Sequence, residues 1–116
     1  MTEKTHTPWM PVCTIDQLQP NSGVAALIEE QQIALFYLPD HQPKVYAIGN
    51  FDPISKANVL SRGIVGELGG ELVVASPVYK QHFRLKDGHC LEEESAHAGS
   101  WPCRIDGDQV LIQAGN

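Results

Sequence analysis

Turn-forming residues divide this chain into segments that are too short for ordinary helices. Gly, Pro, Asn and Asp recur about every eight to twelve residues, and the segments between them alternate apolar and polar side chains as strands do. The run 33–38 is apolar on both alternating sets, which predicts a central strand covered on both faces. Asp106-Gly107 between two such segments predicts a β-hairpin. We therefore expect an all-β, antiparallel sandwich of about nine short strands with at most one or two single-turn helices.

Local signals place several individual elements. Lys44–Ile48 follows a loop rich in turn formers and is expected to pair with the central strand as a hairpin. Ser55–Leu60 is expected to form one helical turn. The alternation along 82–85 predicts a buried Phe83, whose replacement by Ala should cost about 3–5 kcal/mol of stability.

Length and composition indicate one soluble globular domain. At 116 residues, with 42% apolar and 19% charged residues, the chain is long enough to bury a core of its own. We expect residues 1–8 to be a flexible N-terminus and residues 9–116 to form a single domain. The net charge of −6 argues against a nucleic-acid partner, because phosphate binding requires clustered Lys and Arg.

Several other classes are disfavoured by missing patterns. The three cysteines have neither disulfide nor metal spacing, which favours a reducing, cytoplasmic location. No window approaches the ~18 apolar residues of a membrane span. No glycine pattern follows a strand and opens a helix, so flavin, nicotinamide and nucleotide binding are not expected of this chain alone.

Two loops carry the polar residues that are most able to support chemistry. The first is Gly49–Ser55 (GNFDPIS), and the second is Ser76–Phe83 (SPVYKQHF), about two dozen residues later. They resemble the two cluster-binding loops of Rieske-type iron-sulfur domains, which read Cys-x-His and Cys-Pro-x-His with a Phe soon after. The resemblance implies a Rieske-like fold with the two loops facing each other.

The residues that bind iron in that family are replaced here. Asn50 and Asp52 stand at the ligand positions of the first loop, and Ser76 and Tyr79 at those of the second. A Rieske cluster needs thiolates on one iron and imidazoles on the other. Because amide, carboxylate, hydroxyl and phenol groups are hard or weak donors, we expect no cluster and no other metal in this chain.

The two loops, with the connecting segment 60–66, also resemble the small subunits of NAD(P)H-dependent assimilatory nitrite reductases, from Trp9 to Ile112. That resemblance implies a cytoplasmic large subunit carrying FAD, an iron-sulfur cluster and sirohaem, which reduces nitrite to ammonium. This chain would be its non-catalytic docking partner, with no cofactor of its own. The alternatives are a Rieske-type ferredoxin component that carries electrons through a two-iron cluster, and a stand-alone ligand-binding β-module.

Asp52 and Tyr79 would form an acid/base pair if the loops brought them together. The favoured interpretation is structural: Asp52 caps the turn at Pro53, and Asn50, Ser76 and Tyr79 hydrogen-bond across the emptied pocket. Zinc binding by histidine and cysteine is disfavoured, because the spacing of the candidates fits no zinc pattern. Those candidates are His82, His89, Cys90 and His97.

The loop tips are the candidate partner contacts. Hydrophobic and cationic side chains exposed there would mark an interface. Alternatively, Phe51 and Val78 fold inward and fill the volume of the missing cluster. The candidate contact residues are Phe51, Pro77, Val78, Lys80, Gln81 and His82.

Overall fold

The run that is apolar on both alternating sets forms the middle of the central sheet. This is a computed structural model, and it describes residues 9–113. The central sheet has the strand order β10-β4-β3-β2. Its strands are β2 (Ser22–Ile28), β3 (Gln31–Tyr37), β4 (Val45–Gly49) and β10 (Ser100–Trp101). The expected hairpin between the central strand and β4 is confirmed, with Leu35 opposite Ala47 in the ladder.

The two faces of this sheet bury separate cores. Ile33 and Leu35 face one apolar cluster, whereas Ala34 and Phe36 face the other, and all four are 0% exposed. Side chains at alternate positions of a strand point to opposite faces, so a strand that is apolar throughout can serve two cores at once. The prediction of a central strand covered on both faces is confirmed.

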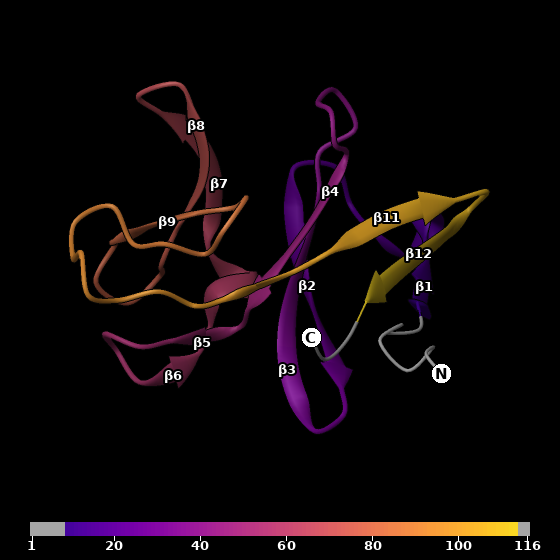
Figure 1. Ribbon diagram of the computed structural model, residues 1–116. Helices are drawn as coiled ribbons and strands as arrows, with labels where there is room; N and C mark the ends of the chain where they lie inside the picture. Colours follow the sequence, from indigo (N-terminus) through magenta and orange to yellow (C-terminus); the bar gives the residue numbers. More distant parts are fainter. Residues whose placement is uncertain (1–8, 114–116) are drawn as a thin grey trace, which may run out of the picture.

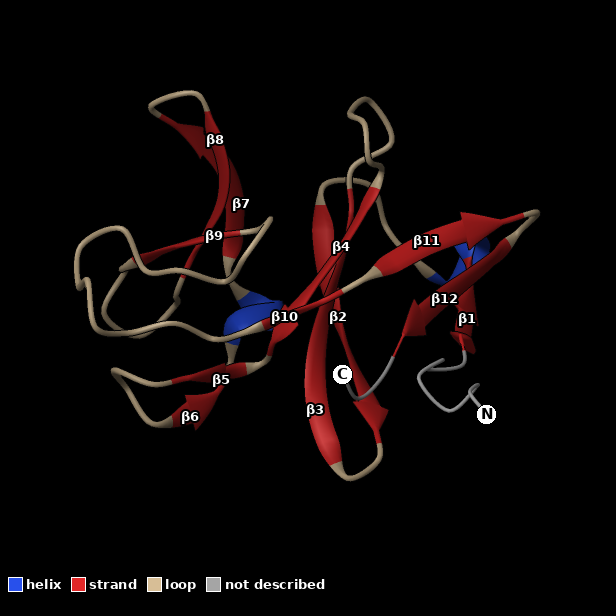
Figure 2. Ribbon diagram, viewed as in Figure 1, coloured by secondary structure: helices blue, strands red, loops and turns tan. Residues whose placement is uncertain are grey.

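One smaller sheet covers each face (Figures 1 and 2). On one side lie β1 (Trp9–Thr14), β12 (Gln109–Gln113) and β11 (Cys103–Asp106), in that order. On the other side lie β7 (Ile64–Leu68), β8 (Glu71–Ala75) and β9 (His82–Arg84). The turn between β11 and β12 is the expected Asp-Gly hairpin, with Gly107 at a φ of 67°.

The first loop and the residues that follow it form a two-stranded ribbon, β5 (Phe51–Asp52) with β6 (Ala57–Asn58). The helical turn expected over Ser55–Leu60 is therefore wrong. The chain reverses within the ribbon, where the Lys56 amide donates to the Asp52 carbonyl at 2.7 Å. Strands of two residues each are too short to show the alternation that would reveal them in the sequence.

The all-β prediction is confirmed. Among residues 9–113 the only helices are two 3₁₀ turns, η2 (Ile15–Gln17) and η3 (Leu60–Arg62). The described residues form twelve strands instead of about nine, because pairs as short as two residues join the ladders. No helix of residues 9–113 has the length and apolar character needed to cross a membrane. The predicted flexible segment 1–8 lies outside the described residues.

Candidate functional site

The two loops meet through a buried hydrogen bond. The hydroxyl of Ser76, at the end of β8, donates to Oδ2 of Asp52 in β5 at 2.5 Å. Asp52 is 0% exposed and Ser76 is 1% exposed. Asp52 and Ser76 lie 24 positions apart in the sequence, so this bond connects the two candidate loops across the intervening strands.

Asp52 also holds the turn that follows it. Its other oxygen, Oδ1, accepts the backbone amides of Ile54 at 2.8 Å and Ser55 at 3.3 Å. Burial by itself would raise the pKa of Asp52, but the hydrogen bonds from Ser76 and from these amides outweigh it and lower the pKa below the ordinary value. Asp52 is therefore an ionised structural carboxylate at neutral pH.

Asn50 anchors the first loop to the central sheet. Its side-chain amide donates to Oε1 of Gln32 at 2.9 Å, and its Oδ1 accepts the backbone amide of Ser61 at 2.7 Å. The Asn50 backbone amide bonds the Gln32 carbonyl as well, at 3.1 Å. Since a buried amide group must be hydrogen-bonded, these contacts explain the choice of Asn at a position that is 2% exposed.

Backbone hydrogen bonds close the second loop into a tight turn. The Ser76 amide donates to the Gln81 carbonyl at 2.8 Å, and the Lys80 amide donates to the Ser76 carbonyl at 3.0 Å. Lys80 has a positive φ of 67°, which closes this turn. Tyr79 lies at the crest and is 61% exposed. Its phenol thus lies outside the hydrogen-bonded pocket, contrary to the structural role that was expected for it.

The geometry supports the structural interpretation over the acid/base one. Both oxygens of Asp52 are occupied by Ser76 and by backbone amides, whereas Tyr79 faces solvent. A general base needs reach to a substrate proton, and a fully buried carboxylate has none. The fold brings Asp52 and Ser76 into contact and buries Asn50 against Gln32 and Ser61, but it leaves Tyr79 in solvent.

The loop tips present apolar side chains to solvent. Phe51 and Val78 are each 45% exposed, so neither fills the volume between the loops. Pro77 and Lys80 are exposed as well, whereas Gln81 and His82 are half-buried. We call the exposed set Phe51, Pro77, Val78, Tyr79 and Lys80 the tip.

His82 is held by a residue that the sequence analysis missed. Glu92 accepts the His82 backbone amide at 2.7 Å and contacts the ring Nδ1 at 2.5 Å. Gln32 and Ser61 were missed in the same way. All three lie ten or more residues from their partners, and no local signal identifies them.

The histidine and cysteine candidates for zinc are dispersed among different contacts. His82 binds Glu92, and His89 faces His97 across an isolated bridge. Cys90 is fully buried in the core, where burial raises the pKa of its thiol. Among residues 9–113 no three His, Cys, Asp or Glu side chains are grouped as a metal site requires.

Comparison with known proteins agrees with these loops and this fold. The chain belongs to the family of Rieske-like [2Fe-2S] domains, whose model matches residues 8–113. It is 45% identical over 105 residues to the NADH nitrite reductase small subunit of Escherichia coli K12, covering 90% of this chain and 96% of the relative. Within the Rieske-like domains it therefore belongs with the nitrite reductase small subunits.

Two further relatives are similar to this chain over most of its length. A solved structure from Mycobacterium tuberculosis, described as an NADH-dependent nitrite reductase small subunit, superposes with a TM-score of 0.88 at 39% identity, covering 96% of this chain and 98% of that one. The nitrite reductase large subunit of Klebsiella oxytoca is 41% identical over 105 residues, which are 90% of this chain but 11% of that protein. A segment similar to this chain is thus part of a much longer polypeptide there.

The donor set of this chain does not fit the cluster for which the family is named. The four positions offer oxygen or amide groups, and Asn50, Asp52 and Ser76 are already engaged in short internal hydrogen bonds. A [2Fe-2S] cluster of the Rieske type requires two thiolates and two imidazoles. In this structure the hydrogen bond between Ser76 and Asp52 joins the two loops.

Proposed function

We propose that this chain is a docking subunit of a nitrite reductase, with no redox centre of its own. It would associate with a large subunit that carries FAD, an iron-sulfur cluster and sirohaem and reduces nitrite to ammonium in the cytoplasm. The observation that carries the proposal is the buried bond between Asp52 and Ser76, which joins the two loops where a cluster would otherwise join them. The chain has the fold of a Rieske-like domain, while Asn50, Asp52 and Ser76 hold its loops in place through hydrogen bonds.

The tip is the surface that we propose for docking. Its apolar side chains lie on loops that are fixed by Asn50, Asp52 and Ser76, so little conformational freedom is lost when they are covered. Exposed aromatic and aliphatic groups on a rigid support are typical of the centre of an interface.

The Klebsiella relative supports a large subunit as the partner. A segment similar to this chain lies within a nitrite reductase large subunit there, so the two functions are joined in one polypeptide. We infer that the separate chain associates with its own large subunit in the ratio of one to one.

Binding of the large subunit tests the proposal directly. This chain is tagged and its large subunit is purified separately. The dissociation constant of the pair is then measured by biolayer interferometry for the wild-type chain and for its variants Phe51→Ser and Val78→Ser. Each variant should weaken binding about tenfold or more, because it removes a buried apolar contact. Leu27→Ser is the matched control, since Leu27 is 68% exposed on β2 and lies outside the tip.

Failure of the wild-type chain to bind the large subunit would reject the docking function. A separate measurement addresses the cluster: the chain is purified from iron-supplied cells and its iron content and visible absorption are recorded. We expect neither stoichiometric iron nor an iron-sulfur spectrum. Two irons per chain would instead establish the ferredoxin alternative.

A further inference from the structure

One edge strand of the molecule is open to solvent. β7 is the first strand of the sheet β7-β8-β9, and among residues 9–113 β8 is the only strand that runs alongside it. Ile64 is 77% exposed and Leu68 is 43% exposed, and a Cβ atom on Gly66 between them would meet nothing within 4 Å. Figure 1 shows the turn from β7 to β8 standing clear of the other elements. Both the edge and the outer face of β7 are therefore accessible.

The pairing of β8 shows which backbone groups of β7 are free. The Leu72 carbonyl accepts an amide at 2.9 Å from the residue that follows β9, so Leu72 directs its backbone groups toward β9. Residues of an antiparallel strand alternate in this respect, so Val73 directs its groups toward its partner in β7, Gly66. The neighbours of Gly66, Val65 and Glu67, then direct their amides and carbonyls away from β8. No hydrogen bond from the rest of residues 9–113 reaches those four groups.

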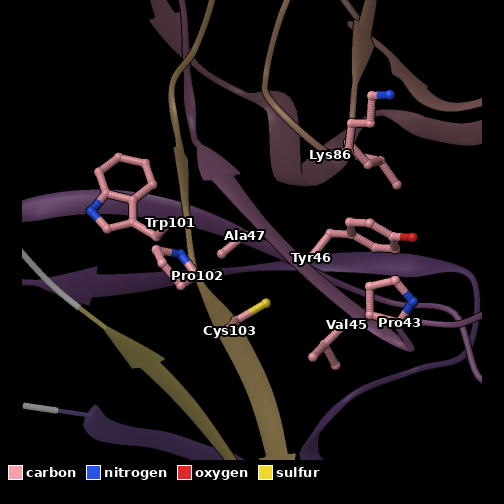
Figure 3. A pocket seen from close by; sticks show the side chains of 9 residues that line it. Pro43, Val45, Tyr46, Ala47, Lys86, Trp101, Pro102 and Cys103 are labelled. Carbon is pink, nitrogen blue, oxygen red and sulfur yellow. The ribbon is translucent and has the colours of Figure 1, made fainter. Parts of the chain in front are cut away.

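β1, β9 and β11 are also edge strands, but each is guarded against pairing, as edge strands of natural sheets are. β1 contains Pro11 and a register shift just after it. The chain that follows β9 covers its outer edge, where the Leu91 amide donates to the His82 carbonyl at 2.9 Å. β11 borders the start of β4 across a cavity of about 360 Å³, which Tyr46 and Pro102 help to line (Figure 3). β7 has neither a proline nor a covering segment among the described residues.

The open edge of β7 is complementary to a second copy of itself. In an antiparallel pair of copies centred on Gly66, Val65 lies opposite Glu67 of the other copy, and these are the residues with free backbone groups. All four free groups of each copy then take part in hydrogen bonds. Ile64 lies opposite Leu68 of the other copy on the outer face, so both exposed apolar side chains gain an apolar neighbour. A two-fold symmetric contact requires such a self-complementary surface.

The register centred on Gly66 is favoured over its neighbours. A shift of one residue would set free backbone groups opposite groups that already bond to β8. A shift of two residues in one direction sets Glu67 opposite Glu67 of the other copy, where like charges repel. The same shift in the other direction sets Val65 opposite Val65 and leaves Leu68 beyond the paired strands. The register centred on Gly66 is thus the one that pairs all five residues of β7 without opposing like charges.

We propose that β7 is a contact between two copies of this chain, which pair antiparallel around Gly66. The sheets of the two copies would form one continuous sheet of six strands, three from each copy. The proposal goes beyond docking: no residue of the tip belongs to β7, so each copy keeps its own site for a large subunit. A five-residue edge buries less than the ~1,200 Å² of a stable complex, so we expect a weak and reversible dimer.

Sedimentation equilibrium of the full chain tests the self-association. The weight-average mass should rise from 12.7 kDa toward twice that value as the concentration approaches about 1 mM. Ile64→Lys and Leu68→Lys should each weaken the association about fivefold or more, because lysine on an edge strand opposes pairing. Leu27→Lys is the matched control, since Leu27 is 68% exposed on β2, which is also an edge strand. It should change the association by less than about twofold.

Cysteine cross-linking with oxidised glutathione tests the register. Gly66→Cys places two thiols opposite each other, where the Cα atoms of such a pair are about 4.5 Å apart, a distance that a disulfide spans. Ile64→Cys is the control, because its two thiols would lie four residues apart along the strands, roughly 13 Å. Gly66→Cys should therefore form the linked dimer about tenfold faster or more than Ile64→Cys. The wild-type chain gives the background from its own three cysteines.

Three results would overturn the proposal. They are a mass that stays at 12.7 kDa over the whole concentration range, an association that Ile64→Lys and Leu68→Lys leave intact, and equal cross-linking by the two cysteine variants. Protection of the Val65 amide from hydrogen exchange only after the large subunit is added would assign the edge to a strand of that subunit and would also reject self-pairing. None of these results bears on docking, which is measured separately through the tip.

Discussion

At the scale of single residues, buried hydrogen bonds join the two candidate loops and hold the first loop on the central sheet. Asp52 is acceptable in the interior because three donors surround it, and Asn50 because the amide and carbonyl of its side chain both have partners. An unpaired buried polar group is costly, so Asp52 and Ser76 each require the other, and Asn50 requires Gln32 and the Ser61 amide. These paired buried groups are the features of a structural site.

Removing one of the hydrogen-bond donors to Asp52 should lower the stability of the folded chain. Ser76→Ala leaves Oδ2 of the buried Asp52 carboxylate without its hydroxyl donor, and we expect it to lower the free energy of unfolding by about 1–3 kcal/mol. Urea denaturation followed by circular dichroism measures the change. Ser95→Ala, on an exposed loop, should stay within about 0.5 kcal/mol of wild type. Equal stability of the two variants would mean that the joint contributes nothing.

The same carboxylate predicts how stability depends on pH. Its pKa in the folded chain lies below the ordinary value of 3.8, so its contribution is present above that value and is lost as the pH falls through the folded pKa. We expect the difference in unfolding free energy between wild type and Asp52→Asn to be largest above about pH 5 and to shrink below pH 4. Denaturation series from pH 7 to pH 2.5 measure it. A difference that does not change with pH would contradict the lowered pKa.

At the scale of elements, close backbone contacts hold the loops against the central sheet. Gly49, the last residue of β4, lies where any Cβ atom would come within 2.2 Å of the Ala98 carbonyl oxygen. The loop that follows β9 thus packs directly on the strand that leads to the first candidate loop, and only glycine leaves room for it. The position of the tip depends on this contact.

A pair of glycine substitutions tests this contact. Gly49→Ala should lower the unfolding free energy by about 1–3 kcal/mol, because the two backbones must move apart. Gly66→Ala in β7 is the matched control, since a Cβ atom there would meet nothing within 4 Å. It should leave stability unchanged or raise it by up to about 1 kcal/mol. A thermal melt of each variant distinguishes the two, and similar melting temperatures would argue against close packing at Gly49.

At the scale of the whole molecule, the three-layer fold places the tip on loops that lie beyond the central sheet. The tip is apolar, and buried hydrogen bonds hold the loops that carry it. A partner that covered the tip would therefore meet a surface that is already ordered.

The assembly ratio is the prediction at this scale. Mixing increasing amounts of this chain with its large subunit should saturate at one copy per large subunit, as inferred from the Klebsiella relative. Size-exclusion chromatography with light scattering measures the mass added to the complex, expected as 12.7 kDa for each large subunit. An addition of twice that mass would rule out the one-to-one complex.

The sequence by itself determined the fold class, and it singled out the two loops that carry the buried polar residues. Alternation over short segments and Asp-Gly turns are local signals, and they predicted the central strand and the hairpin at Asp106-Gly107. The loop motifs are local as well, so Asn50, Asp52, Ser76 and Tyr79 could be identified by spacing alone. Such signals depend only on residues that are close together in the sequence, so they can be recognised without knowing how the chain packs.

Only the tertiary structure decided what those residues do. The partners of Asn50 and Asp52 lie 18 and 24 residues away, and strand register, which no short window of sequence contains, brings them within bonding distance. The backbone hydrogen bonds of the second loop turn Tyr79 outward, and Ala57–Asn58 pairs with Phe51–Asp52 as a strand. The partner that each buried polar side chain meets is decided by packing and not by its neighbours in the sequence.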